Sequence, residues 1–254
     1  MLLTKLIPIH TRFFSSFLKQ TISKLLPSVC ILCGLSLHAQ SSAYFCRACL
    51  QNLPILPQAC RQCAQFLPAM QATPIPLICG MCLQHSPPFE ATYALFPYAP
   101  PISNLIIQLK FHHQLSHANA LGELLVQKII HDWYQTKPLP DLIIPVPLHH
   151  LRLRERGFNQ ALEIAKPAAK ALHIPIDAFG LKRSKSTAVQ SHLKAKAREQ
   201  NVAQAFVATR DYTSLSVCLV DDVITTGQTI TACAKVLKQA GAKTIDVWCC
   251  ARRG

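Results

Sequence analysis

Hydrophobic and polar positions between residues 118 and 250 follow two alternating patterns. In the first, apolar residues recur at intervals of three and four, as Leu121, Leu124 and Leu125 do, which predicts amphipathic helices. In the second, short runs of Val, Ile and Leu predict buried strands. Pro167 is expected to bend one predicted helix. Helices are predicted at 118–135, 158–172 and 228–239, and strands at 141–146, 205–209, 217–220 and 244–250.

This alternation indicates an α/β fold with a mainly parallel sheet. The chain before it differs, because residues 30–89 contain seven prolines and little periodicity. Residues 11–26 combine apolar positions with Arg12, Lys19 and Lys24, which predicts a basic amphipathic helix. We therefore expect an N-terminal basic amphipathic segment (1–27), a small cysteine-rich domain (28–89) and an α/β domain (90–254).

The basic helix predicted at 11–26 could touch DNA or lipid headgroups, or could dock on the protein, but no segment has the features of a membrane span or of a secretory signal. Lys5 and Pro8 interrupt the apolar stretch 2–9, whereas a signal peptide has an uninterrupted apolar region. No run of about 18 apolar residues exists, so no membrane span is predicted. We expect a cytoplasmic protein in a reducing compartment.

Eight of the twelve cysteines form four pairs with the spacing C-x-x-C. This spacing lets two thiolates from one tight turn bind the same tetrahedral zinc ion. Gly34 and Gly80 fit the positive φ that such turns often need. A disulfide framework is the alternative, but the regular repeat and the expected compartment favour two structural zinc ions. The predicted zinc ligands are Cys30, Cys33, Cys46, Cys49, Cys60, Cys63, Cys79 and Cys82.

The way in which these pairs share the ions stays open. The gaps between the pairs are twelve, ten and fifteen residues, which allow two tandem ribbons or a RING-like cross-brace. Sequential pairing is favoured because each ribbon then closes locally. The other four cysteines lie in apolar stretches and are expected to be small core residues: Cys218, Cys233, Cys249 and Cys250.

The charge of the chain favours an anionic partner. There are 26 Lys and Arg against 12 Asp and Glu, which gives a formal net charge of +14. Two zinc ions on eight thiolates lower this to about +10. Such a charge favours nucleic acid or a phosphate-rich ligand, and a generically basic protein is the alternative.

An acidic pair and a Thr/Gly loop follow the predicted strand at 217–220. Backbone N–H groups of such a loop, at the start of a helix, bind a monophosphate, and Thr hydroxyls add donors. The carboxylates can accept from ribose hydroxyls and help to hold a Mg²⁺-bound diphosphate. A helix N-cap with incidental acids is the alternative. The segment looks like the phosphoribosyl pyrophosphate (PRPP) signature of type I phosphoribosyltransferases, with the candidates Asp221, Asp222, Thr225, Thr226, Gly227 and Thr229.

Two basic segments are candidates for binding pyrophosphate. Three arginines in five residues follow the strand at 141–146, and arginine makes bidentate contacts with phosphate. Residues 182–198 hold six basic residues and no acidic one. That stretch can close over pyrophosphate, track a nucleic-acid backbone or form a basic surface helix. The candidates are Arg152, Arg156, Lys182 and Arg183.

The combined motifs resemble the ComF/GntX-type family, in which a double zinc ribbon precedes a type I phosphoribosyltransferase-like domain. The resemblance covers residues 28–253. It implies a bacterial cytoplasmic protein of natural transformation that binds PRPP with Mg²⁺ and handles incoming single-stranded DNA. DNA-uptake or recombination proteins are partners of the expected kind. Further segments that carry the resemblance are Leu109-Lys110-Phe111, Pro145-Val146-Pro147-Leu148-His149, Arg156-Gly157-Phe158-Asn159-Gln160, and Arg198 with Asn201.

Three functions are compatible with these features. As a phosphoribosyltransferase, the chain would transfer the phosphoribosyl group of PRPP, with the leaving pyrophosphate stabilised by Mg²⁺ and arginines. No nucleobase pocket is readable, so the sequence names neither an acceptor nor a catalytic residue. As a non-catalytic adaptor, the chain would bind nucleic acid and keep the phosphoribosyl site as a scaffold. As a sensor, it would couple PRPP binding to DNA affinity.

Overall fold

The computed structural model describes residues 28–37, 42–68, 77–184 and 205–254. The chain forms two compact units, Met1–Leu53 and Pro54–Gly254. The predicted basic helix at 11–26 and the basic residues between 185 and 198 lie outside the described residues. Among the helices of the described ranges, none combines the length and the apolar content that crossing a membrane requires.

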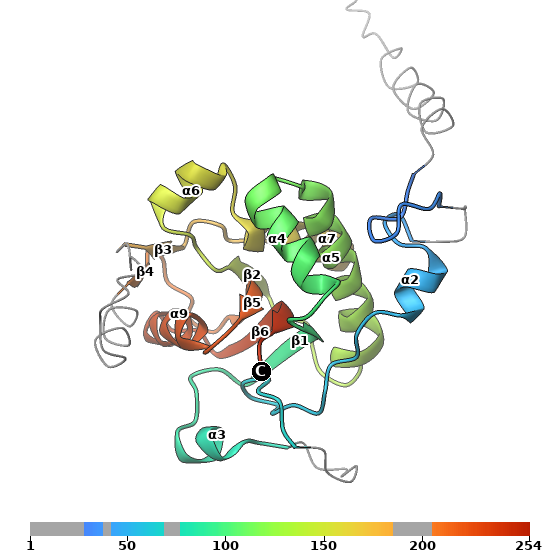
Figure 1. The fold of residues 1–254 in the computed structure, drawn as a ribbon. Coiled ribbons are helices and arrows are strands. Elements are labelled where there is room, and N and C mark those ends of the chain that lie inside the picture. The colour runs from blue at the N-terminus through green and yellow to red at the C-terminus, as the bar shows by residue number, and fades with distance from the viewer. Residues whose placement is uncertain (1–27, 38–41, 69–76, 185–204) are drawn as a thin grey trace, which may run out of the picture. The chain divides into compact units, whose positions relative to one another are not determined.

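The larger unit is built around a four-stranded, wholly parallel sheet, as the alternating pattern predicts (Figure 1). Its spatial order is β1-β6-β5-β2. The central strands β5 and β6 are buried along most of their length, as expected of a parallel sheet that is covered on both faces. The strands are β1 (Ala91–Pro97), β2 (Leu142–Pro145), β5 (Ser216–Ile224) and β6 (Thr244–Arg252).

Helices cover both faces of this sheet (Figure 1). On one side, α5 (Leu115–Lys128) packs against α7 (Gln160–Leu172), while α9 (Gln228–Gln239) lies on the other side. The two helices approach each other closely at Gly122 of α5. A Cβ added at this position would lie only 2.6 Å from Cγ of Pro167, so the contact leaves no room for a side chain. The helix predicted at 158–172 is observed as one element, α7, which contains Pro167 in its interior. The other helices in the described part of this unit are α3 (Gly80–Gln84), α4 (Ile102–His112), α6 (His150–Arg156) and the π-helical turn η1 (Ile129–Trp133).

The observed strands differ from their predicted bounds by one to four residues at an end, and two of them change the picture of the site. β5 continues through the acidic pair to Ile224, because β6 pairs with it as far as Arg252. The strand predicted at 205–209 is β4 (Phe206–Ala208), and it pairs antiparallel with β3 (Leu181–Arg183) outside the main sheet. The acidic pair thus lies within a strand and does not begin the loop.

The second cysteine ribbon belongs to the larger unit. Its Arg61 carbonyl accepts a hydrogen bond of 3.0 Å from Thr92 N of β1. Its Ala64 is 2% exposed and lies in the same buried apolar cluster as residues of β5, β6 and α9. The boundary between the two compact units, after Leu53, therefore falls inside the range 28–89 that the sequence assigns to both ribbons.

Candidate functional site

The eight paired cysteines form two clusters, each made of two consecutive C-x-x-C pairs. Within each cluster the four sulfur atoms lie within 4.8 Å of one another. The sulfur of Cys33 is 3.7 Å from that of Cys46, and the sulfur of Cys63 is 3.7 Å from that of Cys79. Sequential pairing is confirmed. Four converging thiol sulfurs are the donor set of a closed structural zinc site, so the two clusters are consistent with two structural zinc ions.

The two ribbons build the first turn of each cluster in the same way. Gly34 N donates to Cys30 O, and Ala64 N donates to Cys60 O, each at 2.8 Å. Gly34 has a φ of +74° and Ala64 a φ of +56°. The expectation that Gly80 serves such a turn is wrong, because Gly80 is the first residue of α3. The positive φ of the second ribbon falls on an alanine instead.

Backbone donors favour the thiolate form at the first cysteine of each cluster. Burial raises the pKa of Cys30, but hydrogen bonds from the backbone of Cys46, Cys33 and Leu32 outweigh it and lower the pKa to about 6. The same balance lowers the pKa of Cys60 to about 7. Burial and the neighbouring thiols raise the pKa of Cys82. A cation is needed to hold four thiolates this close together.

In the larger unit, three separate segments of the sequence meet at Asp222. This side chain is 2% exposed. Its Oδ1 accepts from Gln160 Nε2 at 3.2 Å, and its Oδ2 forms an ion pair with Lys110. Gln160 Oε1 in turn accepts from Arg156 Nη1 at 2.5 Å. The carboxylate is therefore joined to the Lys110 and Arg156–Gln160 segments, which lie far from it in the sequence.

The two carboxylates of the acidic pair face opposite sides of the sheet, because side chains alternate along a strand. Asp222 faces α4 and α7, whereas Asp221 interacts electrostatically with Cys233 of α9. Asp221 Oδ1 also accepts from the backbone N of Asp222 at 2.9 Å. Burial, together with the charge of Asp222, raises the pKa of Asp221 well above its usual range.

The Thr/Gly loop joins β5 to α9. Thr225 and Thr226 are exposed, and Thr229 lies half-buried in the first turn of α9. Gly227 is the N-cap of this helix with a φ of +77°, and a Cβ there would meet nothing within 4 Å. Glycine is needed here for its backbone conformation, and the space around it stays open. An exposed loop at a helix N-terminus has the donors that bind a phosphate.

Three of the four predicted pyrophosphate ligands gather near the acidic pair. Burial lowers the pKa of Arg156, Asp222 opposes this shift and Arg152 adds to it. Burial also lowers the pKa of Arg183, which interacts with both Arg152 and Asp221. Lys182 is exposed and, as the strand neighbour of Arg183, points to the opposite face of β3.

The structure adds three residues to the predicted set. His149 is the N-cap of α6 and is 5% exposed. Burial lowers the pKa of His149, and the nearby charges of His150 and Arg183 lower it further. Lys110 and Gln160 contact Asp222 directly. All three lie in segments that carry the family resemblance, so their spacing in the sequence held the signal, but only the fold shows what they touch.

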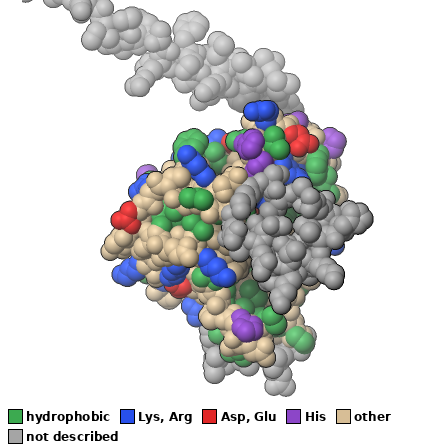
Figure 2. Space-filling view, turned by 90° about the vertical axis from the view of Figure 1, so that its left-hand side faces the viewer, with side chains coloured by type: hydrophobic (Ala, Val, Ile, Leu, Met, Phe, Trp, Pro, Cys, Tyr) green, Lys and Arg blue, Asp and Glu red, His purple; other side chains and the backbone are tan. Residues whose placement is uncertain are grey.

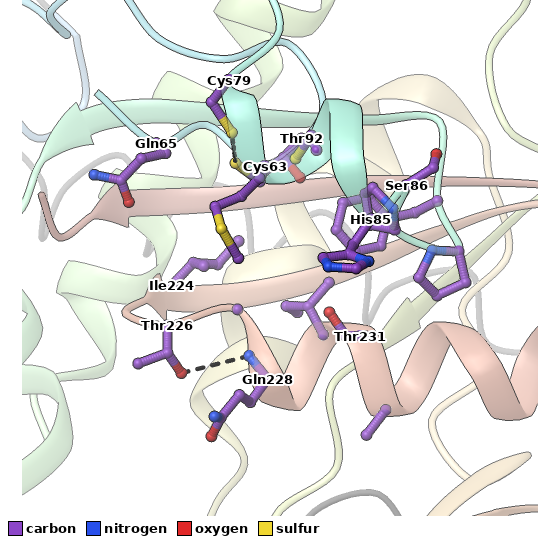
Figure 3. Close-up of a pocket in the computed structure, with 18 of the residues that line it drawn as sticks. Cys63, Gln65, Cys79, His85, Ser86, Thr92, Ile224, Thr226, Gln228 and Thr231 are labelled. Carbon is purple, nitrogen blue, oxygen red and sulfur yellow. Dashed lines mark hydrogen bonds between the residues drawn. The ribbon is translucent and has the colours of Figure 1, made fainter. Parts of the chain in front are cut away.

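A cavity of about 510 Å³ lies between the second ribbon and α9. The ribbon contributes Gln65 and His85, and the loop and helix contribute Thr226, Gln228 and Thr231 (Figure 3). In the same view, Thr226 Oγ1 accepts from Gln228 N at 3.5 Å. The cavity is not lined by Asp221 or Asp222. Thr226 and Gly227 of the Thr/Gly loop do line it.

Comparison with known proteins accounts for both parts of the chain. Residues 21–84 match the model described as a double zinc ribbon domain, and residues 159–254 match that of the phosphoribosyl transferase domain. The DNA utilization protein YhgH of Salmonella typhi is 38% identical over 227 residues, which are 89% of this chain and 97% of that protein. The chain belongs to the ComF/YhgH competence family.

A second member of the ComF/YhgH family is similarly close. Competence protein F of Haemophilus influenzae is 35% identical over 228 residues, which are 88% of this chain and 96% of that protein. Among solved structures, a purine phosphoribosyltransferase from Pyrococcus horikoshii Ot3 covers 54% of this chain and 81% of its own, at 17% identity and a TM-score of 0.33. That likeness is too distant to transfer the role of any residue.

Proposed function

We propose that this ComF/YhgH-family chain binds PRPP with Mg²⁺ at the carboxyl edge of the sheet and handles incoming single-stranded DNA in the cytoplasm. The junction at Asp222 carries this proposal. There, Lys110 and Gln160 hold a buried carboxylate close to an exposed loop at a helix N-terminus. Ligands of open α/β sheets bind at this edge, beyond the carboxyl ends of the strands.

Each candidate group has a role in this proposal. The N–H groups and hydroxyls of Thr225, Thr226, Gly227 and Thr229 would bind the 5-phosphate. The carboxylates of Asp221 and Asp222 face opposite sides of β5. Each would either accept from a ribose hydroxyl or offer hard oxygens of the kind that suits Mg²⁺, which would neutralise the diphosphate when bound. A ligand phosphate would compete with Asp222 for the Lys110 ammonium. Arg152, Arg156 and Arg183 would bind pyrophosphate, and Lys182 would act at the rim.

The DNA part of the proposal rests on charge, on an exposed aromatic ring and on the relatives. The relatives carry the names DNA utilization protein and competence protein. Lys and Arg outnumber Asp and Glu on the face shown in Figure 2. Phe111 is 65% exposed, and its ring centre lies 6.0 Å from the Arg156 guanidinium. An exposed ring next to cations suits base stacking on a single strand.

Calorimetric titration of PRPP with Mg²⁺ into the zinc-loaded protein tests the site. We expect binding in the wild-type chain and its loss in the Asp221→Asn/Asp222→Asn variant. Asp132→Asn is the matched control, because Asp132 pairs with Lys128 on the exposed surface. Undiminished affinity in the double variant would show that the acidic pair does not bind the ligand.

A second experiment separates the enzyme from the adaptor and the sensor. Pyrophosphate release from PRPP is followed with and without a single-stranded oligonucleotide, and DNA binding is measured by fluorescence anisotropy across a salt series. Release that depends on Asp222 supports the transferase. DNA binding that weakens steeply with salt, without pyrophosphate release, supports the adaptor. A PRPP-dependent change of DNA affinity without turnover supports the sensor.

A further inference from the structure

Arg252 lies at the last position of β6 and is 4% exposed. On one side, its Nη1 donates to the carbonyl of Ile224 at 3.1 Å and to the carbonyl of Thr225. These carbonyls begin the Thr/Gly loop. The next residue adds to this contact, because Arg253 N also donates to Ile224 O at 3.0 Å.

On its other side, Arg252 contacts the second ribbon. Its Nε donates to the carbonyl of Cys63 at 3.2 Å, and its Nη2 donates to Oε1 of Gln65 at 2.7 Å. Cys63 also contributes a sulfur to the second cysteine cluster. One guanidinium therefore bridges a residue of the metal site and the start of the proposed phosphate-binding loop.

All of these hydrogen bonds form only when the second ribbon and the start of the Thr/Gly loop are both in the observed position. The acceptors are neutral oxygens, and a buried guanidinium is costly unless its donors are satisfied. The planar fork of arginine reaches two segments at once, which the compact ammonium of lysine does not. If the ribbon moved, Nε and Nη2 would lose their acceptors. The lowest free energy therefore keeps the loop and the ribbon in one arrangement.

We infer that Arg252 is a positioning residue through which the second cysteine site, but not the first, sets the conformation of the loop at residues 224–227. The inference rests on the proposed function for its ligand, PRPP, but the position of the loop can be measured without ligand. Cys30, Cys33, Cys46 and Cys49 belong to the other compact unit and therefore provide an internal control.

The main test uses two mild variants and one control. Gln65→Ala removes one ribbon acceptor while leaving Arg252 and the loop unchanged, and Arg252→Lys keeps the buried charge but not the fork. Arg253→Lys is the control, because Arg253 is exposed at the adjacent position. Zinc content and the unfolding midpoint are measured first, so that loop effects are compared between folded, zinc-loaded chains.

Hydrogen exchange of the segment 221–231 is the readout that does not need PRPP. We expect at least about tenfold faster exchange in Arg252→Lys and a smaller increase in Gln65→Ala, with two zinc ions retained. PRPP affinity should fall about tenfold in Arg252→Lys, since small displacements of binding groups are costly. Unchanged exchange in both variants would overturn the inference. Absence of PRPP binding in the wild-type chain would refute the proposed function and leave the exchange result decisive.

A pair of cysteine variants tests the difference between the two sites. Cys49→Ser and Cys82→Ser each remove one ligand at the same place in the two ribbons, within α2 (Arg47–Gln51) and α3. We expect faster exchange at 221–231 only in Cys82→Ser. Equal exchange in the two variants would contradict coupling through the second site.

Discussion

The two ribbons share one sequence pattern but differ in what surrounds them. The first lies in its own compact unit, and its Cys33 is exposed. The second packs on the sheet of the larger unit, with Cys60 and Cys82 both buried. A metal in the first ribbon therefore stabilises that ribbon, whereas a metal in the second also stabilises the surface on which the Thr/Gly loop rests.

The largest expected effect comes from removing one ligand in each ribbon. Structural zinc contributes about 10–16 kcal/mol of folding free energy in small metal-dependent domains. We expect Cys49→Ser to lose one zinc ion and leave the main calorimetric unfolding transition unchanged. Cys82→Ser should also lose one zinc ion but lower the midpoint of that transition. Equal midpoints, with zinc content measured in parallel, would remove the distinction between the ribbons.

The next effect concerns Asp222, whose carboxylate joins Lys110 of α4 and Gln160 of α7 to β5. Asp222→Asn leaves the Lys110 ammonium without its charged partner, and we expect a loss of about 1–3 kcal/mol in the free energy of unfolding. Urea denaturation measures this loss. Adding Lys110→Met should restore part of the stability without restoring PRPP binding. Restored binding in the double variant would show that the carboxylate does not contact the ligand.

Asp221 should behave in the opposite way. Because its pKa is raised in the folded chain, the folded state keeps a proton that the unfolded state releases. Stability therefore falls as the pH rises from the usual Asp range through the raised pKa, and it is highest below that window. We expect Asp221→Asn to be as stable as the wild type at acidic pH and more stable at about pH 7. A variant less stable than the wild type at both pH values would contradict this.

The smallest expected effect is the change in stability when the positive-φ residue in the first turn of each ribbon is replaced. Gly34→Ala places a Cβ at positive φ and should cost about 1 kcal/mol in the stability of the smaller unit. Ala64→Gly relieves the same strain but loses a buried methyl group worth about 0.8 kcal/mol, so its net change should be close to zero. Zinc competition with a chelator measures both. A large loss for Ala64→Gly would show that the methyl packing dominates.

The predicted elements vary in accuracy for identifiable reasons. The helix predicted at 228–239 matches α9, because only one of its faces is apolar. β1 was not predicted, since it is a short, mostly apolar segment without strict alternation. α4 was also missed, although Ile102, Leu105, Ile106 and Leu109 follow the helical spacing and are buried. The antiparallel pairing of β4 with β3 depends on contacts between distant segments, which local spacing does not encode.

The sequence by itself determined the cysteine pairs, the acidic pair with its Thr/Gly loop and the alternation of strands and helices, because spacing and local chemistry specify each of them. Only the tertiary structure decided that Asp221 and Asp222 face opposite sides of the sheet, that Lys110 and Gln160 meet Asp222, and that Arg252 joins the second ribbon to the loop. The physical reason is that these contacts depend on which strands are neighbours and how far they remain paired. Parallel pairing of β5 and β6 brings residues 224 and 252 side by side, although they lie far apart in the sequence.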